Sequence, residues 1–168
     1  MDASFGEIVK TDNDVTVPIY RGDGKPLFKQ FNGVVIESVD NDSITFNLQD
    51  KDISSYDSYL LTAAKDNRKA WWGREVSDKV IEKAYQSSVD EGVLTTSRHS
   101  RLRCYDLEKA QVDVDSLKAG TRCDIVVQVN NLWFTKRNFG PDWYSVQIKV
   151  HPEPEKDPYD DYLFQDDE

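Results

Sequence analysis

Residues 121–150 read TRCDIVVQVNNLWFTKRNFGPDWYSVQIKV, and this stretch carries the clearest structural pattern in the chain. Apolar and polar residues alternate in its first half, which is the period of a β-strand that turns one face toward a core. The apolar positions there are Cys123, Ile125, Val127 and Val129. Because Gly140-Pro141 favours a loop, the pattern predicts two long strands, over about 121–135 and 143–150.

The same alternation predicts which side chains face the core. In the first strand it places Trp133 on the inward face and Phe134 on the outward face. In the second strand it places Tyr144 inward and Trp143 outward, on the same face as Lys149. An outward tryptophan near a lysine exposes a large apolar surface to water, which indicates a ligand-binding surface.

Earlier in the chain, the patterns predict two hairpins, a helix and a short strand. Turn residues separate alternating segments within 15–31 and within 34–48, so each range predicts a hairpin. Apolar residues at helical spacing predict one helix over about 75–89, whereas residues 50–74 show no clear periodicity. Leu102 and Cys104 alternate with polar neighbours in the short strand.

This arrangement of about seven strands and one helix, without a βαβ rhythm, indicates a mainly β fold. We expect a five-stranded OB-type antiparallel barrel, elaborated by an extra N-terminal hairpin and one inserted helix.

Acidic residues are concentrated near the C-terminus. The formal net charge of the 168 residues is −10, and residues 152–168 contain eight acids, one lysine and three prolines. We therefore expect a folded domain over 1–151 and a disordered acidic tail over 152–168. Because the domain holds 20 bases against 23 acids, it can still present a basic surface.

Most enzyme classes find no support in the sequence. It contains no HExxH metal motif, no glycine-rich phosphate loop and no GxSxG nucleophile elbow. Cys104 and Cys123 have no close spacing, so we expect two buried reduced thiols rather than a disulfide framework or a zinc site. We expect no catalysis, no cofactor and no metal; a nuclease that holds magnesium with carboxylates alone stays open as an alternative.

No apolar run approaches the roughly 20 residues of a membrane span. The N-terminus MDASFGEIVK lacks the pattern of a signal peptide. We therefore expect a soluble intracellular protein with no membrane partner.

Aromatic and basic residues interleave around the loop between the two long strands. Five aromatic residues and two bases lie between positions 133 and 144. Exposed rings can stack on nucleic-acid bases, and nearby cations neutralise phosphates. The alternative for each ring is a place in the core of a small β domain. Of the adjacent Trp71 and Trp72, one is expected in the core and the other at the surface.

The tail combines acids with apolar residues. Such a segment can imitate a phosphate backbone in the protein's own basic groove and offer apolar side chains to partner proteins; the alternative is a solubilising tail. The residues expected to bind partners are Tyr159, Asp160, Asp161, Tyr162, Leu163, Phe164, Asp166, Asp167 and Glu168.

The late motif GxxxDIVVQVxxLWFxKxNFGPDWYSVQIKV, together with the acidic aromatic C-terminus, resembles the replicative single-stranded DNA-binding proteins of phages and large DNA viruses. The resemblance covers about residues 117–150 and the tail. It implies an OB fold that coats exposed DNA strands without sequence preference during replication, recombination or repair, and a tail that recruits a polymerase or helicase. It implies stacking by Phe134, Phe139 and Trp143, and phosphate contacts by Lys136, Arg137 and Lys149.

Charge and strand parity add further candidate DNA-binding residues. These are Lys69, Trp72, Arg74, Arg98, Arg101, Arg103 and Tyr105. Arg101, Arg103 and Tyr105 share one face of the short strand, which can equally be an ordinary solvated edge. The leading hypothesis is a single-stranded DNA-binding protein that could act as a homodimer. The alternatives are a protein-interaction β-barrel or DNA mimic that binds no nucleic acid, and a virion component.

Overall fold

The computed structural model describes residues 2–152, 159 and 162–165. Within them the chain forms a ten-stranded sheet, three α-helices and one short 3-10 helix. The strands are β1 (Ala3–Phe5), β2 (Val9–Lys10), β3 (Val15–Arg21), β4 (Phe28–Val39), β5 (Ser43–Asn47), β6 (Val89–Asp90), β7 (Val93–Tyr105), β8 (Gln111–Val112), β9 (Arg122–Phe134) and β10 (Phe139–Val150). The helices are α1 (Ser54–Asp66), α2 (Arg68–Trp72), α3 (Asp78–Ala84) and the 3-10 helix η1 (Val114–Ser116).

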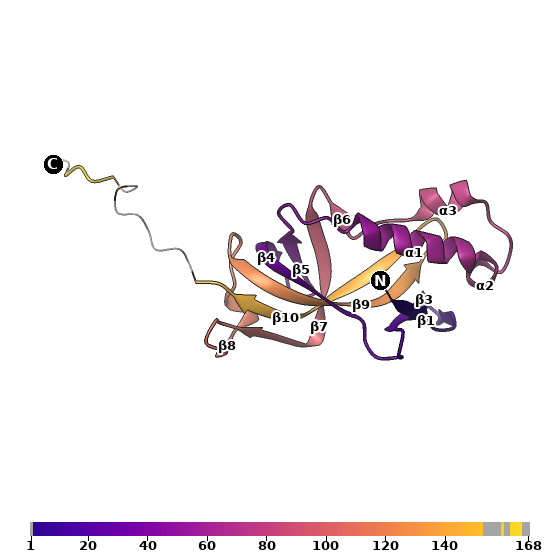
Figure 1. Cartoon of the computed structure of the whole chain (residues 1–168), viewed down its shortest axis with the longest axis horizontal. Coiled ribbons are helices and arrows are strands. Elements are labelled where there is room, and N and C mark those ends of the chain that lie inside the picture. Colours follow the sequence, from indigo (N-terminus) through magenta and orange to yellow (C-terminus); the bar gives the residue numbers. More distant parts are fainter. Residues whose placement is uncertain (1, 153–158, 160–161, 166–168) are drawn as a thin grey trace.

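Five of the strands pair in a closed ring (Figure 1). β9 pairs with β10, β10 with β7, β7 with β5, β5 with β4, and β4 returns to β9. β7 and β10 run parallel, and the other four pairs are antiparallel. The predicted mainly β fold of OB type is therefore confirmed, with one parallel pair where only antiparallel pairing is expected from the sequence.

The N-terminal strands pair differently from the prediction. The prediction of a hairpin over 15–31 is wrong, because β3 and β4 pair with successive parts of the same long strand, β9. Both are antiparallel to β9, so they run in the same direction and cannot form a hairpin with each other. β3 instead forms a short hairpin with β2 and also pairs with β1. The hairpin predicted over 34–48 is confirmed by the pairing of β4 with β5.

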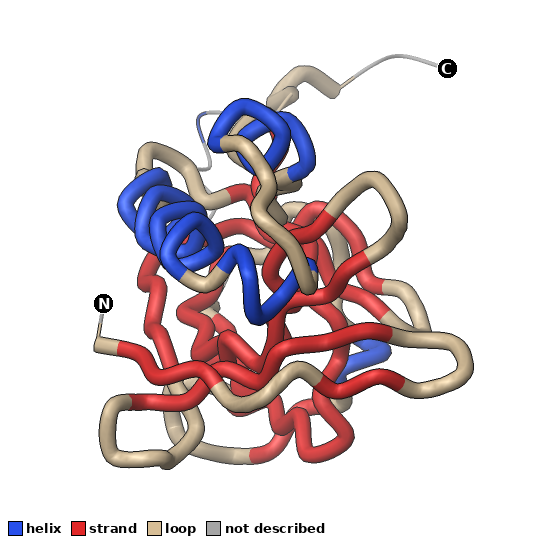
Figure 2. Tube along the Cα trace, turned by 90° about the vertical axis from the view of Figure 1, so that its right-hand side faces the viewer, coloured by secondary structure: helices blue, strands red, loops and turns tan. Residues whose placement is uncertain are grey.

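Three helices take the place of the single predicted helix. α3 lies inside the predicted range 75–89, and its N-cap residue is Ser77, whose hydroxyl accepts a hydrogen bond from the Val80 amide. α1 and α2 lie in residues 50–74, where no periodicity is visible. All three lie between β5 and β7 in the chain and gather at one end of the sheet, which faces the viewer in Figure 2.

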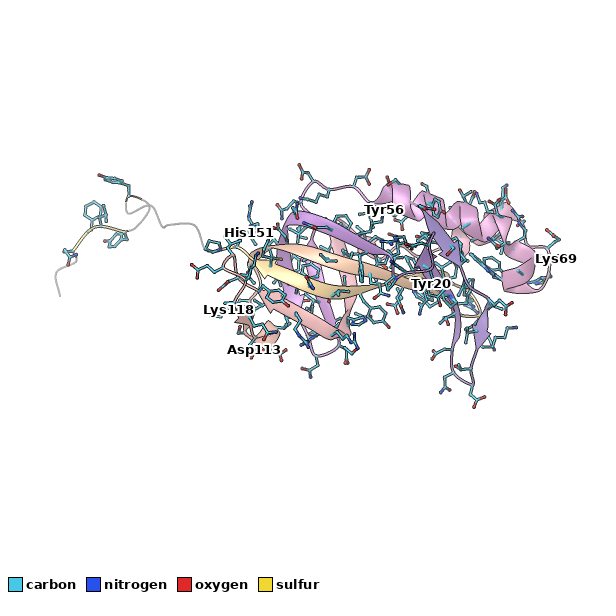
Figure 3. All side chains as sticks on the ribbon, turned by 60° about the horizontal axis from the view of Figure 1, so that its bottom comes forward. Tyr20, Tyr56, Lys69, Asp113, Lys118 and His151 are labelled. Carbon is cyan, nitrogen blue, oxygen red and sulfur yellow. The ribbon has the colours of Figure 1, made fainter. Side chains whose placement is uncertain are left out.

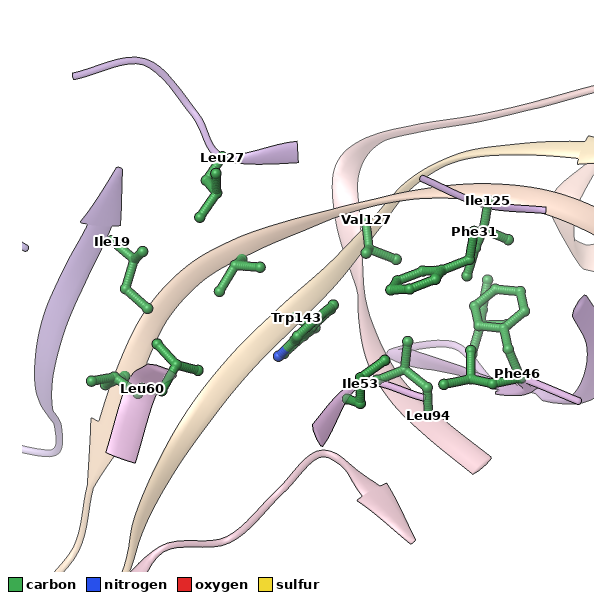
Figure 4. Close-up of a cluster of buried hydrophobic side chains, with 14 of the residues drawn as sticks. Ile19, Leu27, Phe31, Phe46, Ile53, Leu60, Leu94, Ile125, Val127 and Trp143 are labelled. Atoms are coloured by element: carbon green, nitrogen blue, oxygen red, sulfur yellow. The ribbon is translucent and has the colours of Figure 1, made fainter. Parts of the chain in front are cut away.

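The interior of the ring is apolar and closely packed. Figure 4 shows Trp143 among Phe31, Val127 and Ile53, side chains from four separate parts of the chain. Cys104 and Cys123 are free and buried, as predicted. Burial raises the pKa of Cys104 to about 11 and that of Cys123 to about 12, so both thiols stay protonated near neutral pH.

Candidate nucleic-acid interface

Two β-bulges decide which side chains of β9 and β10 face the interior. Trp143 pairs with Val129 while Asp142 pairs with Asn131, so β9 carries one extra residue at that point. A second irregularity lies between Ser145 and Gln147 of β10. A shift of one residue moves the side chains beyond it to the opposite face of the strand. Simple alternation is therefore right for Lys149, which is exposed, and wrong for Trp143.

The outward orientation predicted for Trp143 is overturned. Its side chain is only 1% exposed, and it stacks on Phe31 with ring centroids 6.2 Å apart. Tyr56 of α1 meets the indole edge-on at 5.8 Å. The indole Nε1 is buried without a hydrogen-bond partner among the described residues. Trp143 is therefore a core residue rather than a ring presented to a ligand.

Phe134 and Phe139 also pack inward, so the expectation that they stand on the surface is wrong. Phe139 is fully buried, and the half-buried Phe134 stacks on it at 5.5 Å with the two rings 11° from parallel. Trp72 of α2 meets both rings edge-on, at 5.4 and 5.2 Å. Trp71 is buried and also contacts Phe134. These rings pack the helices against the ends of β9 and β10. Edge-to-face and stacked aromatic pairs stabilise this packing beyond the gain from burying apolar surface.

Trp133 is predicted inward, but the bulge in β9 places it on the face opposite the buried Leu132, where it is half-buried. Its ring lies over Gly140 of β10, where a Cβ atom would sit 3.2 Å from the indole and 2.3 Å from the main-chain oxygen of Gln86. Only glycine fits at this position. The close approach lets the Gln86 amide donate to the Phe139 carbonyl at 2.8 Å.

Strand register brings three of the predicted site residues together on the outer face of the ring. Tyr105 of β7 lies opposite Lys149 of β10, and Arg103 lies opposite Gln147. A groove of about 350 Å³ runs along this face. The side chains and main chain that line it include Gln30, Tyr105, Lys109, Val126, Gln147 and Lys149. We call it the outer-face groove.

A second group of rings continues this face toward the helices. Tyr144 lies opposite Ser97 of β7 and opposite Gln128 of β9, and Gln128 in turn lies opposite Phe28 of β4. Phe28 is 49% exposed and Tyr144 is half-buried. His99 meets the Tyr144 ring edge-on at 5.8 Å. The outer face therefore presents partly exposed rings next to cationic side chains.

The remaining predicted bases are not all brought to this face. Arg101 is exposed on a bulge of β7, where four residues separate Arg98 from Arg103 and one residue separates their partners on β10. Arg98 is held by Asp115, at 2.8 Å, and by the Asp40 carbonyl, at 3.0 Å. The others lie at or beside the helical end, and Figure 3 shows Lys69 there, far from His151, which follows Lys149 by two residues. This separate set is Lys69, Trp72, Arg74, Lys136 and Arg137.

Comparison with protein families gives a match over most of the chain. A model described as "Family of unknown function (DUF5871)" matches residues 32–166. The chain belongs to the DUF5871 family. No curated protein matches its sequence.

Three solved structures from bacteriophage Enc34 resemble this DUF5871 chain. The C-terminally truncated single-stranded DNA-binding protein has a TM-score of 0.48 and 10% identity, over 90% of this chain and 95% of that one. The same protein without that truncation gives 0.45 and 11%, over 96% of each chain. Its complex with ssDNA gives 0.44 and 12%, over 90% of this chain and 97% of that one. These sequence identities and TM-scores are too low to assign a function by similarity. A function for this chain has to be inferred from its own surface.

The outer face carries both bases and acids, because Asp106 and Asp124 line the groove together with Lys109 and Lys149. Arg101, Arg103 and Lys109 make no ion pair with any carboxylate that the structure describes. Asp124 lines the groove, and its carboxylate lies 3.7 Å from the Lys149 ammonium. Burial acts to raise the Asp124 pKa, but hydrogen bonds from the Gly33 amide and His151 bring it below its usual value. Asp124 therefore stays ionised and offsets part of the Lys149 charge.

Over the described residues, no group of three or more His, Cys, Asp or Glu side chains is placed to hold a metal ion. In the same part of the chain, no helix has the length and apolar character needed to cross a membrane.

Sequence reasoning misses four residues of this face. Alternation assigns Tyr144 to the core, and only knowledge of the bulge would correct it. Leu27 and Phe31 are buried on the inner face, and alternation places Phe28 on the outer face, so this residue could have been found from the pattern. His99 and Lys109 carry no pattern of their own, because their places depend on the β7 bulge and on the turn before β8.

Proposed function

We propose that this chain binds single-stranded DNA, largely without regard to sequence, on the outer face of β7, β9 and β10. The observation that carries the proposal is the register that sets Tyr105 opposite Lys149 and places Arg103 and Tyr144 on neighbouring parts of the same face. A base stacked on an aromatic side chain gains about 1–3 kcal/mol whatever its identity. Cations nearby neutralise phosphates and release counterions.

The proposal extends to the organisation of the chain. Residues 1–151 would form the binding domain and residues 152–168 an acidic tail. The protein would coat exposed strands during replication, recombination or repair, without catalysing a reaction, and could do so as a homodimer. The tail would recruit a polymerase or helicase. Its Tyr159, Tyr162, Leu163 and Phe164 are exposed, whereas Asp160, Asp161, Asp166, Asp167 and Glu168 lie outside the described residues.

Titration of labelled 16-nucleotide dT and U strands at two salt concentrations tests the binding itself. We expect binding at low salt that weakens as salt rises, with a log–log slope of about −0.7 for each phosphate neutralised. Arg103→Gln should make the slope shallower by about 0.7, because one contact is lost. Arg74→Gln removes the same charge at the helical end and should leave the slope unchanged.

Failure to bind either strand at low salt would refute the proposal. Copurification of a protein partner in that case would favour the alternative of a protein-interaction barrel. A slope that responds equally to Arg74→Gln and Arg103→Gln would show that the strand does not follow the outer face.

Removal of residues 152–168 is expected to tighten binding to dT strands. The segment carries a net charge of −7 and competes with phosphates for the same cations. The measurement is the dissociation constant of the shortened and the full-length chain at low and high salt. The difference should shrink at high salt, where charge interactions are screened. Weaker binding by the shortened chain would show that the tail does not compete.

A further inference from the structure

An acidic side chain, Asp142, lies next to Tyr144 on the proposed DNA-binding face. It is half-buried and lies two residues before Tyr144, on the same face of β10. The Ser97 hydroxyl donates to its Oδ1 atom at 3.3 Å, and the hydroxyl of Tyr144 on the same face is close enough to lower the pKa of the carboxyl. No lysine, arginine or histidine among the described residues forms an ion pair with it.

A carboxylate at this position would be unfavourable if the face only had to bind phosphates. A carboxylate repels the DNA backbone, and burial without a cation costs free energy. Burial accordingly raises the pKa of Asp142, although the two hydroxyls act in the opposite direction. A carboxylate has about four acceptor positions, and the Ser97 hydroxyl uses one of them. Asp142 can therefore still accept hydrogen bonds from a ligand.

Asn131 supplies an independent sign that a hydrogen-bond donor is missing here. It is the register partner of Asp142 on β9. Its Oδ1 atom is buried and has no hydrogen-bond partner within the described part of the chain. An acceptor left in this state costs free energy, which is recovered when the Asn131 side chain turns to meet a donor on a bound base. Two neighbouring acceptors, one of them charged, thus face the same side of the sheet.

Among the four DNA bases, guanine fits this pair of acceptors. Its Watson–Crick edge carries adjacent N1–H and N2–H donors, which one carboxylate can accept together as charge-assisted hydrogen bonds. Thymine presents a single N3–H between two carbonyl oxygens, which the carboxylate repels. Adenine and cytosine present one amino donor beside a ring nitrogen that is a hydrogen-bond acceptor, so the carboxylate can receive only one hydrogen bond from either base. Asp142 lies two residues from Tyr144 on the same face of β10, so a base stacked on the Tyr144 ring has an edge near the carboxylate.

We propose that Asp142, with Asn131 beside it, forms a subsite for the Watson–Crick edge of an unpaired guanine that stacks on Tyr144. The subsite rests on the proposed function and adds to it a preference at one position of an otherwise tolerant surface. Its ligand class is single-stranded DNA that contains guanine.

The test compares three labelled 16-nucleotide strands: dT16, alternating thymine and 7-deazaguanine, and alternating thymine and inosine. The 7-deaza base keeps both donors but lacks the N7 atom required for quadruplexes, and inosine keeps N1–H but lacks the amino group. The wild-type chain should bind the deazaguanine strand about tenfold more tightly than dT16, which is the discrimination typical of a bidentate contact. The inosine strand should fall between them.

Asp142→Asn should bring the ratio of the deazaguanine and dT16 affinities close to one, and it should leave dT16 binding unchanged or tighter because a repelling charge is gone. Asp124→Asn, the matched control, removes a charge from the same face and should leave the ratio unchanged. Equal wild-type affinities for dT16 and the deazaguanine strand, or a preference that persists in Asp142→Asn, would overturn the subsite. Absence of binding to every strand would instead refute the proposed function, and the subsite with it.

Discussion

Trp143→Ala is expected to lower the free energy of unfolding by about 3–5 kcal/mol, the usual cost of truncating a large buried aromatic side chain. The side chain is 1% exposed and contacts Phe31 and Tyr56, so its loss opens a cavity between the ring of strands and α1. Urea or thermal unfolding followed by circular dichroism measures the effect. Trp143→Phe should cost less, because it fills part of the cavity and removes the buried Nε1–H that lacks a partner.

Tyr144→Ala is the matched control for this prediction. The residue is adjacent in sequence but half-buried on the outer face, so its truncation should cost about 1 kcal/mol or less in stability. The pair separates a core role from a binding role. A Trp143→Ala chain that keeps wild-type stability and loses DNA binding would place Trp143 at the surface and contradict the packing described above.

The double variant Tyr105→Ala, Tyr144→Ala is expected to lose about 2–6 kcal/mol of binding free energy toward dT strands, since each stacked base contributes about 1–3 kcal/mol. This corresponds to a loss of affinity on the order of 30- to 10⁴-fold. Fluorescence anisotropy of a labelled strand at low salt measures it. The salt dependence should stay close to that of the wild type, because the lysines and arginines of the face are unchanged.

Tyr20→Ala provides a control for the loss of an exposed tyrosine. Tyr20 is 40% exposed on β3, next to β1 and outside the outer-face groove, so its removal should leave affinity unchanged. If the double variant binds dT strands as tightly as the wild type, then the rings of the outer face do not stack on bases. If Tyr20→Ala weakens binding as much, then the strand takes a different path over the chain.

The sequence predicts the positions of the long strands better than it predicts which of their aromatic side chains are buried. Strand positions are recovered well: the ranges 121–135 and 143–150 compare with Arg122–Phe134 and Phe139–Val150. Charge and strand parity also identify Arg103 and Tyr105, and the family resemblance identifies Lys149; strand register brings the three together. The sequence predicts the stacking residues poorly: it proposes Phe139 and Trp143, whose burial depends on partners far away in the sequence.

The helices illustrate the same limit. α1 and α2 lie where no apolar period is visible, and α2 has only five residues. Short helices have little stability of their own and form because tertiary packing buries part of their surface. Trp71 and Trp72 supply that packing by contacting Phe134 and Phe139 at the ends of β9 and β10. Local sequence cannot reveal a helix whose stability comes from such contacts.

The order of the residues is enough to establish that this chain is mainly β, where its longest strands lie, and that an acidic segment follows them. Those properties follow from local alternation and composition, which need no knowledge of neighbouring strands. Tertiary structure alone decided that β3 and β4 share β9, and which rings of β9 and β10 turn outward. The reason is that a β-bulge shifts the alternation by one residue, and its position is set by the pairing of two strands rather than by the order of residues in either.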